Sequence, residues 1–126
     1  MTRRIFLPTL LLLGLTSSGM AAFGVEEAEE KVSPEHPNNL NASGKYEGAT
    51  TVVTLNWVDR SNNETGFEVL RSDNAGEFRV VGLVGANTTR YIDKIGKYTT
   101  GAFTYAVRAL NQYGKSDASN KASVWF

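Results

Sequence analysis

The sequence predicts an all-β domain built as an antiparallel sandwich of about seven strands. Apolar and polar residues alternate with a period of two in several short segments, which is typical of strands with one buried face. Turn-forming residues separate these segments at spacings of roughly 8 to 14 residues. No segment of useful length has the period of a helix. A chain of 126 residues can hold one such domain and a single core.

The expected strands all lie after residue 37. In the segment 51–57, Val53, Leu55 and Trp57 share one face, so this segment predicts a strand with a buried side. The segment 103–110 alternates in the same way and runs into a turn at 111–114. Further strands are expected at residues 67–71, 78–84, 88–92 and about 121–126, and further turns at 59–66, 73–76, 85–87 and 96–101.

Residues 1–22 have the pattern of an export signal. Arg3 and Arg4 form a basic start, residues 5–15 are mostly apolar, and small residues follow up to Ala22. The apolar run is shorter than the roughly 20 residues that a membrane span needs. We therefore expect a mature chain that begins near Phe23, has no membrane span, and is exported to a periplasm or to the extracellular space. Both the general secretory and the twin-arginine route remain open.

Residues 23–37 form an acidic segment with five acidic residues and one basic residue. Because this segment has few branched apolar residues, we expect a flexible, solvated leader, with an acidic partner-binding tail as the alternative. The residues from 38 to the end carry eight acidic and ten basic residues. Neither net charge is large enough to indicate binding to nucleic acid.

Serine and aspartate are plentiful, but a catalytic base to activate a serine is missing. The chain has no cysteine, and its one histidine, His36, lies in the leader. We therefore predict no catalytic residues, no cofactor and no metal site. The lack of disulfides in a small exported domain also favours a bacterial source. The loop 59–64 carries alternating oxygen side chains of a kind that bind calcium, but we expect Asp59 and Ser61 to accept N–H groups of their own loop instead.

Three motifs occur in a fixed order after the leader. They are Leu55-Asn-Trp57, then Asp59-x-Ser61-x-Asn-Glu64-x-Gly66-Phe67-x-Val69-x-Arg71-Ser72, and then Tyr105-x-Val107-x-Ala109-x-Asn111-x-x-Gly114-x-Ser116. With these motifs, the region 38–126 resembles a fibronectin type III domain of the type found in bacterial secreted proteins. The resemblance implies an immunoglobulin-like sandwich with a first strand near residues 37–42. It also implies a role in adhesion, protein interaction or the support of carbohydrate-active proteins.

One position departs from the family pattern. The family usually has a tyrosine at the start of its sixth strand, and the hydroxyl of this tyrosine bonds back to the chain at the sheet corner. The corresponding residue here is Phe103. A backbone group left unpaired by this change costs on the order of 1 kcal/mol. Tyr98 and Tyr105 are the two residues that we consider for a compensating hydrogen bond.

We predict an exported, non-catalytic binding or scaffold module that mediates protein interaction or adhesion. Glu68 and Arg108 are expected to face outward and to pair across neighbouring strands. We expect Val124 to point inward and Trp125 to be exposed on an edge strand. The candidate contact residues are Glu68, Leu70, Arg108, Leu110, Tyr113 and Trp125, and the loops 59–66 and 97–101 are further candidate surfaces.

Two other functions remain open at this stage. The first is a carbohydrate-binding module that stacks sugar rings on Tyr91, Tyr113 or Trp125. The second is a small hydrolase, which the lack of a catalytic base disfavours. The expected partner is thus a protein or a polysaccharide.

Overall fold

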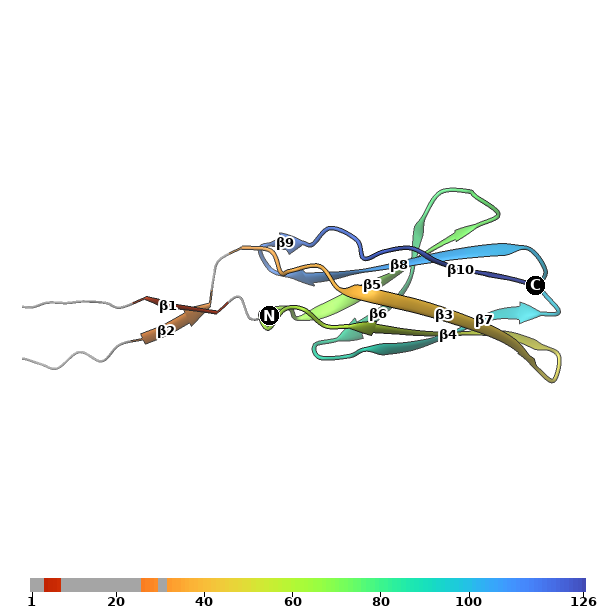
Figure 1. Ribbon diagram of the computed structural model, residues 1–126, viewed down its shortest axis with the longest axis horizontal. Coiled ribbons are helices and arrows are strands. Elements are labelled where there is room, and N and C mark those ends of the chain that lie inside the picture. Colours follow the sequence, from red (N-terminus) through yellow and green to blue (C-terminus); the bar gives the residue numbers. More distant parts are fainter. Residues whose placement is uncertain (1–3, 8–25, 30–31) are drawn as a thin grey trace, which may run out of the picture.

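Strands β3 to β10 form a sandwich of two antiparallel sheets, and the described part of the chain has no helix (Figure 1). The computed structural model describes residues 4–7, 26–29 and 32–126. One sheet has three strands in the order β3-β4-β7 and the other has five, in the order β10-β8-β5-β6 with β9 beside β8. The predicted all-β sandwich is confirmed. The strands are β3 (Asn38–Glu47), β4 (Thr50–Val58), β5 (Gly66–Asp73), β6 (Arg79–Gly85), β7 (Arg90–Lys97), β8 (Ala102–Asn111), β9 (Gly114–Lys115) and β10 (Ala122–Trp125).

Two strands differ in extent from the sequence-based expectation. β3 continues to Glu47, well beyond residue 42, because it forms a long hairpin with β4. Gly48 closes this hairpin at a φ of +60°, a conformation that glycine adopts without a steric penalty. β7 reaches Lys97 and so includes part of the predicted 96–101 turn. Each extension contains only one large apolar residue, Tyr46 or Ile95, so alternation alone did not indicate them.

The core lies between the two sheets and is made of the inward-facing residues of each strand. Val53 and Leu55 are fully buried, and Trp57 packs edge-on against Phe67 with ring centroids 5.7 Å apart. The inward set of β8, which includes Val107, is also buried. Each such side chain contributes about 1.5–3 kcal/mol of transfer free energy. The predicted inner faces of these strands are confirmed.

The last strand follows the expected alternation. Val124 is buried among the core residues, whereas Trp125 keeps 74% of its surface exposed. The register sets Val124 opposite Phe103 and Trp125 opposite Ala102. The prediction of Val124 inside and Trp125 outside is therefore confirmed.

A buried ion pair joins the two sheets. Arg71 on β5 donates from Nη1 to Asp93 Oδ2 on β7 at 2.8 Å, and both side chains are about nine-tenths buried. The Tyr105 hydroxyl donates to the same Oδ2 at 2.8 Å. Arg71 Nε also donates to Asp73 Oδ1 at 2.6 Å. The sequence did not indicate this cluster, because Arg71 is the last residue of the strand expected at 67–71 and Asp93 follows the strand expected at 88–92.

The charges in this cluster support one another. Burial raises the pKa of the Tyr105 hydroxyl far above its usual range, and the hydrogen bond to Asp93 raises it further, because the carboxylate favours the protonated phenol. Burial alone would lower the pKa of Arg71, but Asp73 and Asp93 outweigh it. The Arg71 guanidinium in turn lowers the pKa of Asp73. Arg71 and Asp73 therefore stay ionised at neutral pH, whereas the Tyr105 hydroxyl stays protonated.

The cluster lies beside the position where the family tyrosine is replaced. Phe103 has no hydroxyl, and its ring instead packs against Phe126 and lies 5.9 Å from the Arg71 guanidinium carbon. Tyr105 makes the buried hydroxyl bond, although its acceptor is a side chain rather than the backbone. Tyr98 is exposed. Of the two candidates for compensation, Tyr105 is thus the residue with a buried hydrogen bond.

The end of the predicted leader contacts the sandwich. Pro34 and Pro37 are buried, and the Val32 carbonyl oxygen accepts hydrogen bonds from the side-chain amides of Asn63 and Asn111. The boundary at residue 37 and the flexibility of the leader remain predictions.

Little of the predicted export signal falls in the described residues. Two short strands, β1 (Arg4–Leu7) and β2 (Glu26–Glu29), pair antiparallel with each other. The rest of the signal, its cleavage site and the first residues of the leader lie outside the described residues. No helix in the described ranges is long and apolar enough to cross a membrane.

We expect Asp93→Ala to lower the free energy of unfolding by about 3 kcal/mol, because it leaves the Arg71 charge buried with only Asp73 as a partner. Tyr105→Phe removes one hydrogen bond to a charged group and should cost less, about 1.5 kcal/mol. Urea titration at pH 7 measures both values. Asp117→Ala, at an exposed position, serves as the control. A loss below about 1 kcal/mol for Asp93→Ala would show that the ion pair does not stabilise the fold.

Candidate functional site

The predicted contact residues fall into two groups on the outer face of the five-stranded sheet. Trp125 lies opposite Ala102, the first residue of β8. Leu110 lies eight residues further along β8, a separation of about 27 Å in an extended strand. Leu110 and Trp125 therefore do not form one patch. Glu68, Arg108 and Tyr113 belong to the Leu110 group.

The Leu110 group is centred on a small charge cluster. Glu68 and Arg108 are directly opposite in the β5–β8 register, and Arg108 Nε donates to Glu68 Oε1 at 2.7 Å. This confirms the predicted cross-strand pair. Lys115 on β9 adds a second bond, from Nζ to Glu68 Oε2 at 2.9 Å. Lys115 reaches Glu68 because a two-residue turn folds β9 back against Leu110.

The two cations hold Glu68 ionised. Burial alone would raise the pKa of Glu68, but the hydrogen bonds and charges of Lys115 and Arg108 outweigh it, so the pKa lies below its ordinary value. The Glu68 side chain is mostly buried, whereas Lys115 and Arg108 are partly exposed. The cluster of two cations and one carboxylate therefore carries a net positive charge.

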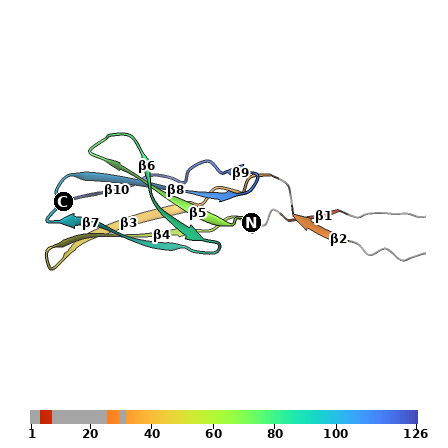
Figure 2. The ribbon, with the colours of Figure 1, turned by 180° about the vertical axis from the view of Figure 1, so that it is seen from behind.

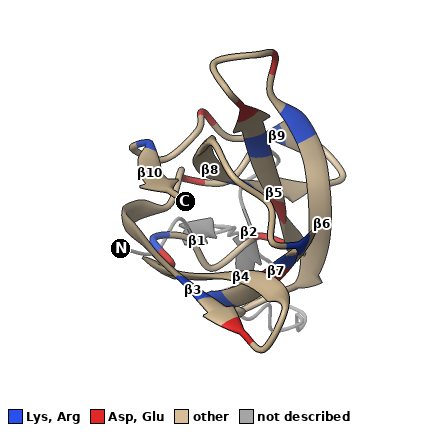
Figure 3. Cartoon of the chain, turned by 90° about the vertical axis from the view of Figure 1, so that its right-hand side faces the viewer, with Lys and Arg blue, Asp and Glu red and all other residues tan. Residues whose placement is uncertain are grey.

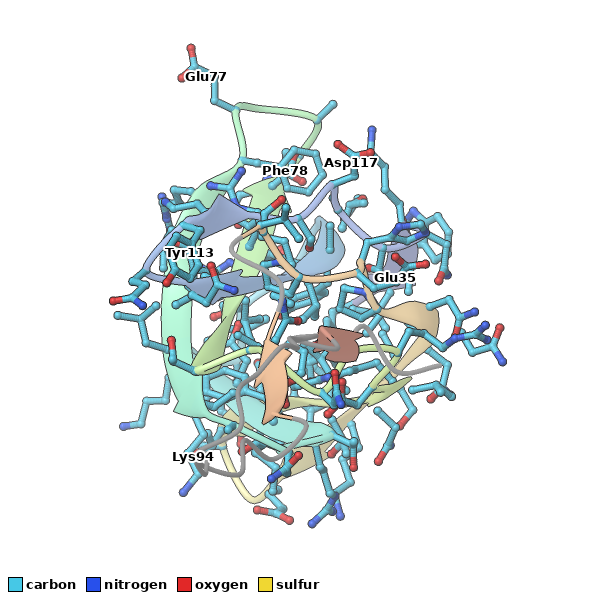
Figure 4. All side chains as sticks on the ribbon, turned by 90° about the vertical axis from the view of Figure 1, so that its left-hand side faces the viewer. Glu35, Glu77, Phe78, Lys94, Tyr113 and Asp117 are labelled. Carbon is cyan, nitrogen blue, oxygen red and sulfur yellow. The ribbon has the colours of Figure 1, made fainter. Side chains whose placement is uncertain are left out.

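Exposed apolar side chains flank this charge cluster. Leu83 on the edge strand β6 lies opposite Glu68 and keeps 68% of its surface exposed. Tyr113, in the turn between β8 and β9, is also exposed and is labelled in Figure 4, which views the molecule from this end. The sequence indicated Tyr113 but not Leu83, because Leu83 lies in an apolar run whose outward positions alternation did not identify.

Leu70 is not available for contact, contrary to its assignment as a candidate. Its position next to Ala106 is on the outer face, but it is only 8% exposed. The β5–β6 hairpin rises above this face (Figure 1), and the Lys121 ammonium lies 5.3 Å from the centre of the Phe78 ring. This contact spans the strands that carry Leu70 and Ala106, which accounts for their burial.

One of the three predicted sugar-stacking residues is held inside the sandwich. Tyr91 lies against Gly82, where any Cβ would meet its ring, and its hydroxyl donates to the Val81 carbonyl oxygen at 3.0 Å. Val81 is the extra residue of a β-bulge in β6, the free edge of its sheet (Figure 2). Tyr113 and Trp125 remain exposed, at opposite ends of the domain.

The loop 59–64 is closed by its own hydrogen bonds. Asp59 Oδ1 accepts the Ser61 N–H at 3.0 Å, as predicted. Ser61 differs from the prediction, because its hydroxyl donates to Glu64 Oε1 at 2.7 Å. Glu64 Oε2 in turn accepts the Asn87 N–H at 3.0 Å. Within the described residues, no three acidic, histidine or cysteine side chains are placed to hold a metal ion.

The fold is shared with several solved structures. An Fn3-like protein from Clostridium thermocellum is 23% identical with a TM-score of 0.56, over 71% of this chain and 90% of that protein. The FN1–FN3 domains of chicken CNTN1 are 21% identical with a TM-score of 0.62, over 82% of this chain and 36% of that structure. This chain has a fibronectin type III fold. No family model and no curated protein sequence matches it.

Other similar structures are much longer than this chain. Titin kinase and its flanking domains are 23% identical with a TM-score of 0.59, but the match covers only 16% of that chain. A β-1,2-glucanase from Parabacteroides distasonis matches over 15% of its length, with 17% identity. Fibronectin type III domains are commonly non-catalytic binding or scaffold modules, and they also occur within enzyme chains. These similarities establish the fold alone.

We expect Glu68→Gln to reduce the acid sensitivity of the domain. The pKa of Glu68 is lowered from its ordinary value of 4.5, so its pairing stabilises the fold above that pH and is lost as the pH falls through the folded-state pKa. Thermal melts at descending pH should show a smaller loss for the variant than for the wild type below about pH 4.5. Glu77→Gln, on the exposed hairpin tip, is the control (Figure 4). Parallel curves for Glu68→Gln and wild type would contradict the pairing.

Proposed function

We propose that the protein is an exported, non-catalytic binding module that contacts a protein partner through the outer face of its five-stranded sheet. The observation that carries this proposal is the exposure of Trp125 and Leu83, at 74% and 68%. They are the two most exposed large apolar side chains in the described part of the chain. Large apolar groups left in water on one face are a common feature of protein-interaction surfaces.

The dimensions of the face suit a protein better than a small ligand. Trp125 and Leu83 lie on opposite edge strands and in rows about 20 Å apart along β8. Four strands across give the face a width of about 14 Å. A single sugar ring cannot reach both Trp125 and Leu83, whereas a protein partner, whose interface covers about 800 Å² on each side, can contact these two separate exposed groups at once.

The charges on the face also favour a protein partner. Glu68 is already paired with Arg108 and Lys115, so covering it does not leave an isolated buried charge. The cations retain exposed surface for an acidic group of the partner. A carbohydrate-binding role based on Tyr91, Tyr113 and Trp125 receives less support, because Tyr91 is held against Gly82 and the other two are far apart.

The export signal predicted for residues 1–22 supports a location in a periplasm or outside the cell, and the lack of cysteine supports a bacterial source. The lack of cysteine and the position of the one histidine in the leader support a role without catalysis.

The proposal is tested by affinity capture from envelope extract, with a polysaccharide fraction in parallel. We expect the wild type to retain a defined protein partner. Trp125→Ala and Leu83→Ser should each weaken this capture by at least about tenfold, because each removes an exposed apolar side chain that the partner would bury on binding. Ile92→Ser is the matched control, because it removes an exposed apolar side chain from the other sheet.

Equal capture by Trp125→Ala, Leu83→Ser and Ile92→Ser would show that the outer face is not the binding surface. Retention of polysaccharide but of no protein would overturn the choice of partner class. Circular dichroism of every variant establishes that a lost interaction does not come from unfolding.

A further inference from the structure

The outer face of the three-stranded sheet carries a group of basic side chains. Val53 on β4 lies opposite Asp93 on β7, and both are buried on the core side. Val52 and Lys94, one position away on each strand, lie opposite each other and therefore point outward. Lys45 on β3 is the other neighbour of Val52 in this row. The two lysine stems flank Val52, which is only 3% exposed although it points outward.

Two further cations follow the same outward alternation along β7. They are Arg90 and Lys97, and like Lys94 they are exposed and have no ion-pair partner among the described residues. Lys45 pairs with Glu47 at 3.2 Å. These four basic residues and one acidic residue give this side of the sheet a net charge of +3. We call the four cations, Lys45, Arg90, Lys94 and Lys97, the basic face.

The basic face is turned away from the rest of the domain. Figure 3 shows β3, β4 and β7 as the lower of the two layers, so their outer side is directed away from the five-stranded sheet. Lys94 points into solvent on the side away from Phe78 (Figure 4). A ligand can therefore approach the basic face without contacting Trp125 or Leu83.

The acidic leader carries the complementary charge. Glutamate occupies four of the five positions from 26 to 30. Three of these glutamates lie in β2, which pairs only with β1 in the described part of the chain. β1 lies within the export signal predicted for residues 1–22, so removal of this signal takes away the strand partner of β2. The leader then has four carboxylates and no paired strand to hold them.

The leader is directed away from the basic face of its own chain. The Val32 carbonyl oxygen is held by the side-chain amides of Asn63 and Asn111, at the end of the sandwich where the leader enters. β2 lies beyond this end (Figure 1). A leader that followed β7 of the same chain would have to reverse its direction between β2 and Val32. The face of a second copy can be reached without this reversal.

The spacing of charges on the leader matches that on β7. Glu26 and Glu30 are four positions apart, as are Arg90 and Lys94. Four residues of extended chain span about 13 Å. An extended leader that lies along β7 can therefore bring one carboxylate to each of these two cations. Lys97 and Lys45 remain for the other glutamates.

We propose that the acidic leader of one copy binds to the basic face of a second copy of this protein. Each copy supplies one leader and one face, so the contact is either reciprocal in a dimer or repeated from copy to copy. An exposed ion pair contributes little by itself, and salt screens it. The association therefore needs several pairs at once, is weak, and is lost at high salt. It uses the opposite sheet from the proposed function, and each proposal can fail without the other.

Sedimentation velocity tests this proposal on the chain that begins at Phe23, which retains every strand of the sandwich. In low salt, we expect the average mass to rise as the protein concentration approaches about 1 mM. Addition of about 0.5 M salt should return it to the mass of the monomer. Two variants should remain monomeric, namely a leader variant with Glu26→Gln, Glu27→Gln, Glu29→Gln and Glu30→Gln, and a face variant with Arg90→Glu and Lys94→Glu.

A mixture of the two variants separates binding between copies from binding within one chain. The leader variant keeps an intact basic face, and the face variant keeps an intact leader. The mixture should therefore form a heterodimer although neither variant associates alone. The control is Arg79→Glu, Lys121→Glu, which changes the net charge by the same amount at the five-stranded sheet and should associate like the wild type.

Four results would overturn the proposal. They are a wild type that is monomeric at every concentration, a leader variant that still associates, mixed variants that do not associate, and a control that loses association as fully as the face variant. A leader bound within its own chain gives the first of these results. Melting curves of each variant verify that the fold is retained.

Discussion

The buried ion pair between Arg71 and Asp93 constrains the arrangement of the whole domain. It joins β5, an inner strand of one sheet, to β7, an edge strand of the other, and the Tyr105 hydroxyl bonds to the same carboxylate oxygen. An ion pair inside a core requires good geometry, because a misplaced partner leaves a desolvated charge. A slip of β5 by one residue would remove Arg71 from Asp93 and turn Phe67 and Val69 outward. The cluster thus selects one register in which the apolar residues are also buried.

The outer surfaces follow from this register. Because Arg71 and Val69 point inward, Glu68 must point outward, where it meets Arg108 and Lys115. The same alternation on the three-stranded sheet directs Asp93 inward and leaves Lys94 in solvent. The two candidate surfaces therefore result from the same packing as the core. They lie on different parts of the molecule, so a protein and a second ligand would not compete for the same side chains.

Local alternation predicted the parts of this structure in which neighbours along the chain decide burial. It predicted the inner faces of β4 and β8, the inward Val124, the exposed Trp125 and the pairing of Glu68 with Arg108. It failed where a distant segment decides burial or pairing. Leu70 is covered by the contact between the Phe78 hairpin and Lys121, and Lys115 reaches Glu68 after a tight turn. Tyr46 on β3 contacts Tyr98, which follows β7. A sequence pattern contains no direct signal for such contacts.

The contact of Tyr91 with the β6 edge affects how copies of the domain behave toward one another. An edge strand with free N–H and C=O groups can pair with another chain and extend the sheet. Here the bulge at Val81 interrupts the regular spacing of β6, and the Tyr91 hydroxyl already occupies the Val81 carbonyl oxygen. An incoming strand would find this section of the edge irregular and partly satisfied. The domain can therefore expose Leu83 on the same strand for recognition while opposing the edge-to-edge association that leads to aggregation.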